Sequence, residues 1–153
     1  REILLPGSGA IKAIAAADFN NDGYVDIVFG NDGHHNQLLL NDRFGNFESP
    51  MNLPGGAIQT YSLSAGDLNN DGLIDLVVGN YNHESQILLN QGGGKFHVPV
   101  DLGDKFLYAT SMSIADFNND GTLDVIISDW FQSSLFLNDG EGNFFDEDIV
   151  LPG

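Results

Sequence analysis

A threefold repeat of an acidic nine-residue pattern limits the possible fold more than any other feature of the chain. The stretches DFNNDGYVD (18–26), DLNNDGLID (67–75) and DFNNDGTLD (116–124) share the pattern D-x-N-x-D-G-x-x-D, and successive copies begin 49 residues apart. Each copy follows a short alternating run such as AIAAAD and precedes an apolar run such as VDIVFG. A fixed period of this length indicates a repeat architecture with one supersecondary unit per repeat.

Each repeat contains four segments of strand length, separated by clusters of Gly, Asn and Asp, and none has a helical period. The second and third segments are continuously apolar, which is typical of strands that are covered on both faces. Small sheets with two buried faces must stack, and radial stacking gives a β-propeller with one repeat per blade. The sequence therefore predicts an all-β fold of three four-stranded antiparallel blades. A sandwich built from a triplicated hairpin pair is the alternative.

The repeats divide the chain into blades at about 8–55, 56–103 and 104–153 of a single propeller or part-propeller domain. Residues 1–7, REILLPG, resemble the closing segment DIVLPG and predict an additional outer strand. Three blades do not close a ring, because propellers typically contain four to eight. We therefore expect either a homo-oligomer, in which two chains complete a six-bladed ring, or a part of a longer propeller.

The charge balance excludes several classes of partner. Lys and Arg number 5 against 22 Asp and Glu, which gives a formal net charge of −17. We expect no nucleic-acid partner, because such ligands require a cationic surface. No segment is long and apolar enough to span a bilayer, so membrane insertion is not expected. Cysteine is absent, so neither a disulfide nor a thiolate metal site is available.

The acidic patterns are candidate metal sites. Positions 1, 3, 5 and 9 supply side-chain oxygens, position 7 offers a backbone carbonyl, and glycine at position 6 permits a sharp turn. An all-oxygen set rich in carboxylates favours Ca²⁺ over Mg²⁺ or Zn²⁺. The three predicted Ca²⁺ sites comprise Asp18, Asn20, Asp22, Tyr24 and Asp26; Asp67, Asn69, Asp71, Leu73 and Asp75; and Asp116, Asn118, Asp120, Thr122 and Asp124.

Two alternatives share part of this pattern. An EF-hand requires a bidentate Glu at position 12, which is occupied here by Phe29, Val78 and Ile127. The site is therefore expected in a loop between two β-strands. The sequence Asn-Asp-Gly also forms plain hairpin turns, but a turn alone does not require Asp at positions 1 and 9 in every copy.

The stretches ADFNNDG, VDIVFGN and LLNQGGGKF resemble the FG-GAP or VCBS repeat, and the resemblance covers essentially the whole chain. That repeat builds the calcium-binding propeller of integrin α subunits and recurs in bacterial surface proteins and some fungal lectins. The resemblance implies a calcium loop between the first and second strands of each blade. The chain differs from the integrin pattern in its shorter repeat and in having three units.

The loops expected at the opposite end of the blades differ between copies: GNDGHHN, GNYNHES and SDWFQSS. The joins between repeats, near Lys12, Tyr61 and Tyr108, are expected on the same side. Divergence within a repeated scaffold indicates where individual function lies. The candidate ligand-binding residues of these loops are His34, His35, Tyr81, His83, Trp130 and Phe131. The aromatic residues either stack on a sugar or protein ligand or pack between blades.

These patterns favour a non-enzymatic calcium-binding module that binds a protein or carbohydrate ligand through its variable loops. We expect it outside the cell, on the cell surface or in the periplasm, because weak calcium sites stay empty at cytosolic calcium levels. An assembly scaffold that closes a ring between chains is the alternative. A glycan-active enzyme is less favoured, because loop histidines are more often plain polar residues and no Ser/His/Asp order or unexplained pair of carboxylates is present in the sequence.

Overall fold

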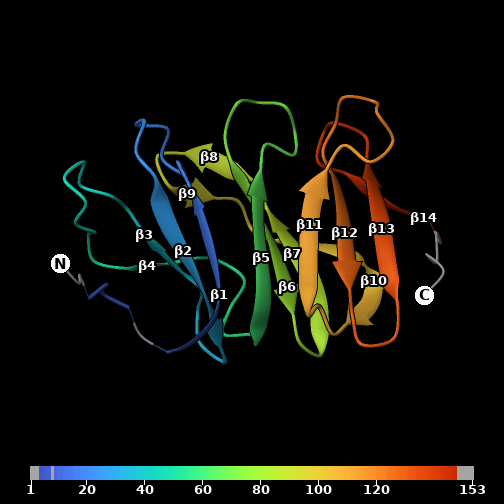
Figure 1. The fold of residues 1–153 in the computed structure, drawn as a ribbon, viewed down its shortest axis with the longest axis horizontal. Helices are drawn as coiled ribbons and strands as arrows, with labels where there is room; N and C mark the ends of the chain where they lie inside the picture. The colour runs from blue at the N-terminus through green and yellow to red at the C-terminus, as the bar shows by residue number, and fades with distance from the viewer. Residues whose placement is uncertain (1–3, 8, 148–153) are drawn as a thin grey trace.

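The computed structural model describes residues 4–7 and 9–147, and within these residues the secondary structure consists of strands and turns without a helix (Figure 1). The strands form three four-stranded sheets and one two-stranded hairpin. Neighbouring strands pair in an antiparallel manner in each sheet. The prediction of an all-β chain with three four-stranded repeats is confirmed.

Each sheet corresponds to one repeat. The first contains β1 (Ala10–Ala17), β2 (Asp26–Asp32), β3 (Gln37–Leu39) and β4 (Met51–Asn52). The second contains β5 (Thr60–Gly66), β6 (Asp75–Asn80), β7 (His83–Leu88) and β10 (Val100–Leu107), with the hairpin β8 (Asn90–Gly92) and β9 (Lys95–Phe96) between β7 and β10. The third contains β11 (Ser111–Ala115), β12 (Asp124–Ser128), β13 (Ser133–Asn138) and β14 (Phe144–Glu147).

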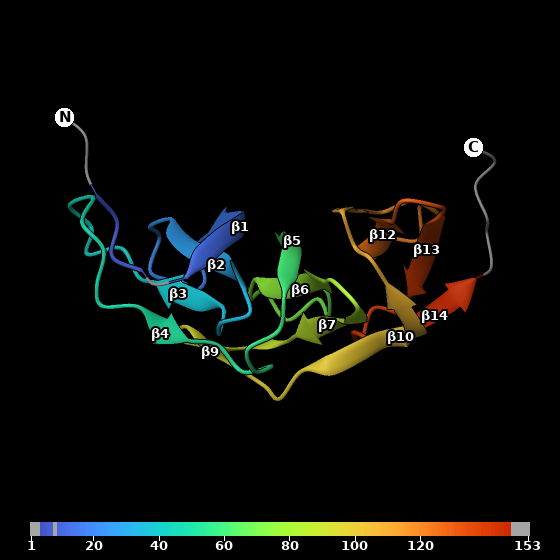
Figure 2. The same cartoon turned by 90° about the horizontal axis from the view of Figure 1, so that it is seen from below.

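The three sheets lie side by side in an arc. Figure 2 shows the first strand of each sheet, β1, β5 and β11, on the concave side and the strands β4, β10 and β14 towards the convex side. β5 makes contact with both β1 and β11. This arrangement is that of successive propeller blades, as the sequence predicts.

The ends of the predicted domain are less fully described. Residues 4–7 have no strand conformation and residues 1–3 lie outside the described part, so the additional outer strand stays a prediction. β10 continues to Leu107, past residue 103, where the sequence places the boundary between the second and third repeats. The predicted closing segment at 148–153 also lies outside the described residues.

The first hairpin of each blade has the same register. Ala17 pairs with Asp26, Gly66 with Asp75, and Ala115 with Asp124. The acidic stretches therefore join the first and second strands at one end of the blades. Because neighbouring strands are antiparallel, the joins between the second and third strands lie at the other end.

The apolar core lies between blades. One cluster joins Phe19, Val28 and Leu38 of the first blade to residues of the second, including Leu76 and Val78. A second cluster, between the second and third blades, contains Leu68, Val77, Ile87, Leu102, Ala109, Val125, Ile127 and Phe136. All six residues of β6 are buried, so the continuously apolar segments are indeed covered on both faces.

Two buried asparagines also link neighbouring blades. Asn90 Nδ2 donates to the carbonyl oxygen of Phe19 in the first blade (2.9 Å) and to that of Ile74 in its own blade (2.8 Å). Asn138 Nδ2 donates in the same way to Leu68 (2.7 Å) and Leu123 (2.9 Å). Each side chain therefore satisfies one buried carbonyl on either side of a blade interface.

We predict that Asn90→Ala lowers the free energy of unfolding by about 2–4 kcal/mol, because two carbonyls lose their partner at a buried site. Denaturant unfolding monitored by circular dichroism measures the change. The matched control is Asn46→Ala in an exposed turn, for which the expected change is about 0.5 kcal/mol or less. Equal effects of the two substitutions would contradict the role assigned to Asn90.

Candidate metal centres and ligand-binding face

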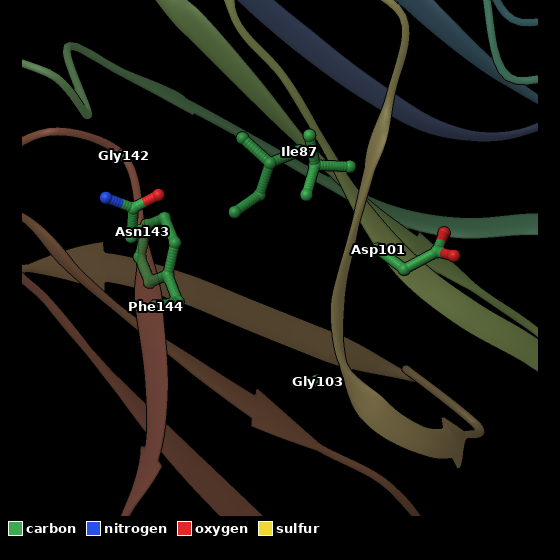
Figure 3. Close-up of a pocket in the computed structure, with 7 residues that line it drawn as sticks. Ile87, Asp101, Gly103, Gly142, Asn143 and Phe144 are labelled. Atoms are coloured by element: carbon green, nitrogen blue, oxygen red, sulfur yellow. The ribbon is translucent and has the colours of Figure 1, made fainter.

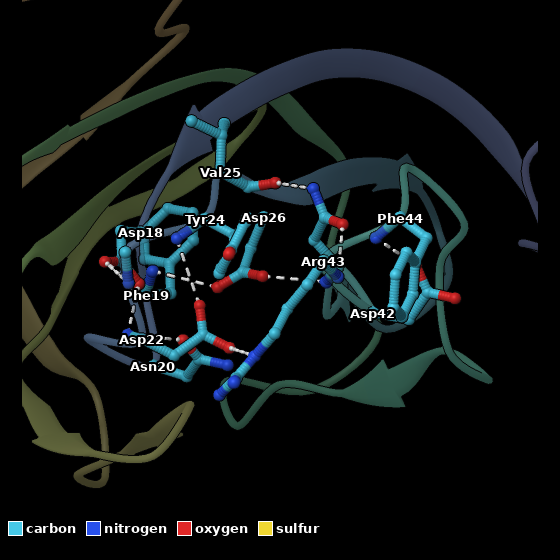
Figure 4. A network of polar contacts seen from close by, with 12 residues as sticks. Asp18, Phe19, Asn20, Asp22, Tyr24, Val25, Asp26, Asp42, Arg43 and Phe44 are labelled. Atoms are coloured by element: carbon cyan, nitrogen blue, oxygen red, sulfur yellow. Dashed lines mark hydrogen bonds and ion pairs between the residues drawn. The ribbon is translucent and has the colours of Figure 1, made fainter.

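Each acidic loop folds around the carboxylate of its first residue. Asp18 Oδ1 accepts the backbone N–H of Asp22 (3.0 Å), and Asp18 Oδ2 accepts that of Gly23 (2.7 Å; Figure 4). The same two bonds occur at Asp67 and at Asp116. The aspartate at position 1 thus fixes the turn in all three copies.

Two positions in each loop have left-handed backbone conformations. The glycines at position 6, predicted from the sequence to form the turn, have positive φ, as do the asparagines at position 4: Asn21 (59°), Asn70 (58°) and Asn119 (61°). Asparagine adopts this region more readily than most residues. Sequence reasoning missed the role of position 4, although the second Asn of NND in every copy was the available signal.

The aspartate at position 9 begins the second strand and is buried in every blade. Asp75 Oδ2 accepts the N–H of Leu68 (2.8 Å), and Asp75 Oδ1 accepts the N–H of Asn90 (2.7 Å). Asp26 and Asp124 make the equivalent bonds. This carboxylate therefore ties the acidic loop to the end of the third strand, a structural role that the metal-site pattern does not reveal.

Burial raises the pKa of Asp26 and of Asp75 above the usual carboxyl value, and backbone N–H donors partly oppose the rise. At Asp75 the neighbouring charges of Asp71 and Asp67 raise the pKa further. The pKa of these groups is higher in the folded state than in the unfolded state. The free energy of unfolding therefore falls as the pH rises through the raised pKa and the groups ionise. A cation in the loop would oppose both causes of the shift.

The donor chemistry of the loops fits a hard cation. The candidate ligands are carboxylate, amide and backbone oxygens, which are the ligands of Ca²⁺. In this structure the carboxylates point to backbone amides. Among residues 4–7 and 9–147, no three His, Cys, Asp or Glu side chains are grouped to hold a metal ion. To bind a cation, these carboxylates would therefore have to release hydrogen bonds that they accept here, such as the one from Tyr24 N–H to Asp22 Oδ1 (3.0 Å).

The first loop differs from the other two in having a positively charged side chain beside it. Arg43 Nε lies 3.7 Å from Asp22 Oδ2, and the guanidinium carbon lies 5.6 Å from the centroid of the Tyr24 ring (Figure 4). The equivalent positions in the other repeats are Gly92 and Gly140. Arg43 shares their positive φ (74°), a conformation that disfavours a long side chain. Among the side chains that the structure describes, Arg43 supplies counter-charge to the first loop and has no equivalent in the other two.

Four aromatic rings meet at the opposite end of the blades, where the second and third blades adjoin. We call Tyr61, Tyr81, Tyr108 and Trp130 the aromatic cluster. The ring centroids of Tyr61 and Tyr81 lie 5.1 Å apart, as do those of Tyr81 and Tyr108. Tyr108 and Trp130 stack at 5.8 Å with an interplanar angle of 10°. Trp130 is 63% exposed, so the cluster presents an accessible indole ring.

A polar group adjoins this cluster at the junction of the first and second blades. Lys12 Nζ lies 5.7 Å from the centroid of the Tyr61 ring and 3.7 Å from Asp32 Oδ2. Gln59 Nε2 donates to Asp32 Oδ1 at 2.8 Å. We call Lys12, Asp32 and Gln59 the polar triad. Asp32 occupies the position of Tyr81 and Trp130 in the other repeats, so equivalent positions carry different chemistry in each blade.

The structure brings some of the predicted ligand-binding residues together. The rings of Tyr81 and Trp130 lie 6.0 Å apart, and the neighbouring Phe131 is 84% exposed. The histidines lie on two blades: His34 and His35 follow β2, where His34 Nδ1 lies 3.1 Å from the Asp32 carbonyl oxygen, and His83 begins β7. Asp32 and Gln59 were missed, because a lone polar loop residue carries no distinguishing sequence signal.

A separate hollow of about 180 Å³ lies between the second and third blades (Figure 3). Its lining residues are Ile87, Val100, Asp101, Gly103, Gly142, Asn143 and Phe144. None of these belongs to the acidic patterns, the aromatic cluster or the polar triad. The hollow is smaller than the ~300–1,000 Å³ typical of small-molecule pockets, so it is not the leading candidate for ligand binding.

A family model described as an FG-GAP-like repeat matches residues 18–78 and 67–127, which together span more than half of the chain. The chain belongs to the FG-GAP-like repeat family. Both matches begin at the first aspartate of an acidic loop and end in the second strand of the next blade. The 49-residue period of the sequence is therefore the period of this family's repeat in the chain.

Solved structures with propeller-like folds are similar to this FG-GAP-like chain at low sequence identity. An Agrocybe aegerita lectin, described for its specific recognition of non-reducing terminal N-acetylglucosamine, aligns with a TM-score of 0.64 and 22% identity over 86% of this chain and 36% of the lectin. The Photorhabdus luminescens Tc holotoxin pore (0.53, 21%, 87% of this chain and 7% of that one) and the V. cholerae biofilm matrix protein Bap1 (0.51, 22%, 86% and 19%) also align.

At these identities the likeness supports the fold alone, and the chain spans little more than a third of the lectin and less of the others. A search of curated proteins found no match. In the part of the FG-GAP-like chain that the structure describes, no helix has the length and apolar character needed to cross a bilayer.

We predict that Arg43→Gly, which gives the first loop the residue of the other repeats, raises its calcium affinity by up to about fivefold. The reason is that an exposed ion pair is worth up to about 1 kcal/mol. Isothermal titration in an Asp71→Asn, Asp120→Asn background isolates the first loop. Arg43→Lys is the control and is expected to change the affinity less. An unchanged affinity in Arg43→Gly would show that the arginine does not compete with calcium.

Proposed function

We propose that this FG-GAP-like chain is a non-enzymatic binding module, stabilised by Ca²⁺ in its three acidic loops, that recognises a carbohydrate at the end opposite those loops. The observation that carries the proposal is the aromatic cluster beside the polar triad. A pyranose ring has an apolar face of C–H groups and an edge of hydroxyls. An exposed indole suits the face, and nearby charged and amide groups suit the hydroxyls.

Three further observations support a carbohydrate ligand. The aromatic cluster and the polar triad are built from loop and strand-end residues that differ between repeats, whereas the scaffold between them is repeated. Trp130 leaves most of its side chain open to solvent although the rings of Tyr81 and Tyr108 lie beside it. Finally, the lectin that aligns with this chain binds a terminal amino sugar, which supports a sugar ligand by analogy of fold.

The calcium part of the proposal rests on electrostatics. Two like charges at ~4 Å repel by about 4 kcal/mol at an effective dielectric constant of ~20, and a metal site in one of these loops would bring its three aspartate carboxylates together. One dication reverses the sign of this repulsion, and three dications reduce the net negative charge of −17 by six. We expect dissociation constants of about 10⁻⁵ to 10⁻³ M, which suit an extracellular, cell-surface or periplasmic location.

A protein ligand is the second candidate, because Phe131 lies beside Trp130 and both are strongly exposed. An exposed aromatic pair is typical of the anchors of protein interfaces. A glycan-active enzyme has less support, because His34 and His35 lie on a different blade from His83.

We predict that calcium raises the melting temperature and that chelation with EDTA lowers it. A site that is 100-fold saturated adds ~2.7 kcal/mol to the free energy of unfolding. Differential scanning calorimetry measures the shift, and Asp67→Asn with Asp71→Asn is expected to reduce it. An identical melt with and without EDTA, together with no metal in elemental analysis, would defeat the calcium proposal.

We predict that Trp130→Ala weakens carbohydrate binding by at least about tenfold, because the stacking surface is lost. A glycan array identifies the sugar, and isothermal titration in millimolar calcium measures its affinity. The control is Phe44→Ala, a strongly exposed ring in the β3–β4 loop at the other end, which is expected to leave binding unchanged. Binding that survives Trp130→Ala would place the site elsewhere.

A further inference from the structure

The first and third blades each expose apolar residues whose equivalents are covered at the interfaces between blades. The third blade exposes one side of such an interface, and the first blade exposes the other side. At position 2 of the acidic loops, Phe19 and Leu68 are fully buried under the next blade, whereas Phe117 is 43% exposed. On the opposite side, Val25 and Ile14 of the first blade are 56% and 61% exposed. Their equivalents Leu63, Met112, Ile74 and Leu123 are partly buried against the preceding blade.

The hydrogen bonds of the internal interfaces also have one donor side and one acceptor side, and the first and third blades each carry one of them. Asn90 and Asn138 each donate one hydrogen bond within their own blade and one to the preceding blade. Asn41, the equivalent residue of the first blade, donates to its own Val25 carbonyl oxygen (3.0 Å). The carbonyl equivalent to those of Phe19 and Leu68 is that of Phe117, at the far end of the chain. The first and third blades are therefore complementary in hydrogen bonding as well as in exposed apolar side chains.

We propose that a second copy of this chain closes the ring, with the third blade of each protomer packed on the first blade of its partner. Two copies give six blades, within the four to eight that propellers contain, whereas three copies would give nine. The closed assembly of the 153-residue chain has twofold symmetry and covers the exposed apolar residues of its first and third blades. The arc in Figure 2, with β1 and β5 on its concave side, has the curvature that a ring of blades requires.

The internal interfaces indicate the contacts of the closing one. Phe117 takes the place of Phe19, whose ring lies 6.1 Å from that of Phe96. The residue equivalent to Phe96 in the first blade is Phe47, so Phe117 faces Phe47 of the partner subunit. Asn41 of the partner subunit donates to the Phe117 carbonyl oxygen. This contact repeats the bond that Asn90 makes with Phe19.

Ser128 makes the proposed interface between protomers less closely packed than the interfaces between blades within the chain. A Cβ atom at Gly30 would lie 2.8 Å from Thr60 Cγ2, and one at Gly79 would lie 2.5 Å from Met112 Cε, so glycine allows the blades to approach closely there. The third repeat has Ser128 at this position, with its Oγ 2.8 Å from Ser133 Oγ. The closing interface therefore forms a dimer that depends on protein concentration.

The proposal does not depend on the ligand, because the aromatic cluster lies between the second and third blades of one chain. The first test is the mass in solution, measured by sedimentation velocity over a range of concentrations in physiological salt and millimolar calcium. The expected mass is twice 16.5 kDa, with dissociation on dilution. A mass of 16.5 kDa at every concentration overturns the proposal.

Substitutions test the two sides of the interface one at a time and leave the net charge of the protein unchanged. Phe117→Gln and Ile14→Gln are each expected to weaken dimerisation at least about tenfold, because each places an amide in an apolar contact. Phe131→Gln and Val98→Gln, at strongly exposed positions outside the proposed interface, are the controls and are expected to leave the dimer intact. Circular dichroism verifies that every variant is folded.

Mixing provides an independent readout. Phe117→Gln and Ile14→Gln damage opposite halves, so a mixed dimer keeps one undamaged contact. Native mass spectrometry of an equimolar mixture is expected to show more mixed dimer than random pairing gives. The reason is that both substitutions fall in one contact of the mixed dimer, where a second amide costs little once the first has disrupted the apolar surface. Ser128→Gly is expected to increase the dimer fraction, because it restores the close approach of the internal interfaces. A dimer that Phe117→Gln and Ile14→Gln leave unchanged overturns the proposal, as does a mixture in which no mixed dimer forms.

Discussion

The buried carboxylate at the end of each acidic loop connects three parts of the protein. Asp75 accepts an amide from its own loop and another from Asn90 at the end of the third strand. The Asn90 side chain then reaches the Phe19 carbonyl in the preceding blade. Loop, blade and blade interface thus form one hydrogen-bonded unit. The requirement for Asp at position 9 follows from this unit alone, before any metal is considered.

The blades were predictable because the relevant signals are local and repeated. The spacing of Asp18, Asp67 and Asp116 sets the period, and continuously apolar runs identify strands that are covered on both faces. The extension of β10 to Leu107 and the β8–β9 hairpin were not predicted. Outer strands and short hairpins depend on pairing with a neighbour at a sheet edge, and their own sequences carry little periodic signal.

The candidate sites were predictable to different degrees for the same reason. The turn of each acidic loop follows from nine consecutive residues, and the glycine at position 6 has the positive φ that the pattern predicts. The carboxylates of these loops accept backbone amides in the structure, so the metal ligands stay a prediction. The aromatic cluster joins Tyr61 to Trp130 across two blades, so the sequence gives its members but not their contact. Arg43 was missed because its role depends on a left-handed turn that brings it back to Asp22. Calcium and carbohydrate binding stay predictions.

The location of the apolar clusters between blades, rather than within them, affects how stability is distributed along the chain. The central blade is supported from both sides, whereas each end blade has one neighbour within the chain. Structures of this kind behave as nearest-neighbour arrays, in which opening begins at unsupported units. In the monomer, amide hydrogens of β6 would then exchange last with solvent, and opening would proceed inwards from the first and third sheets.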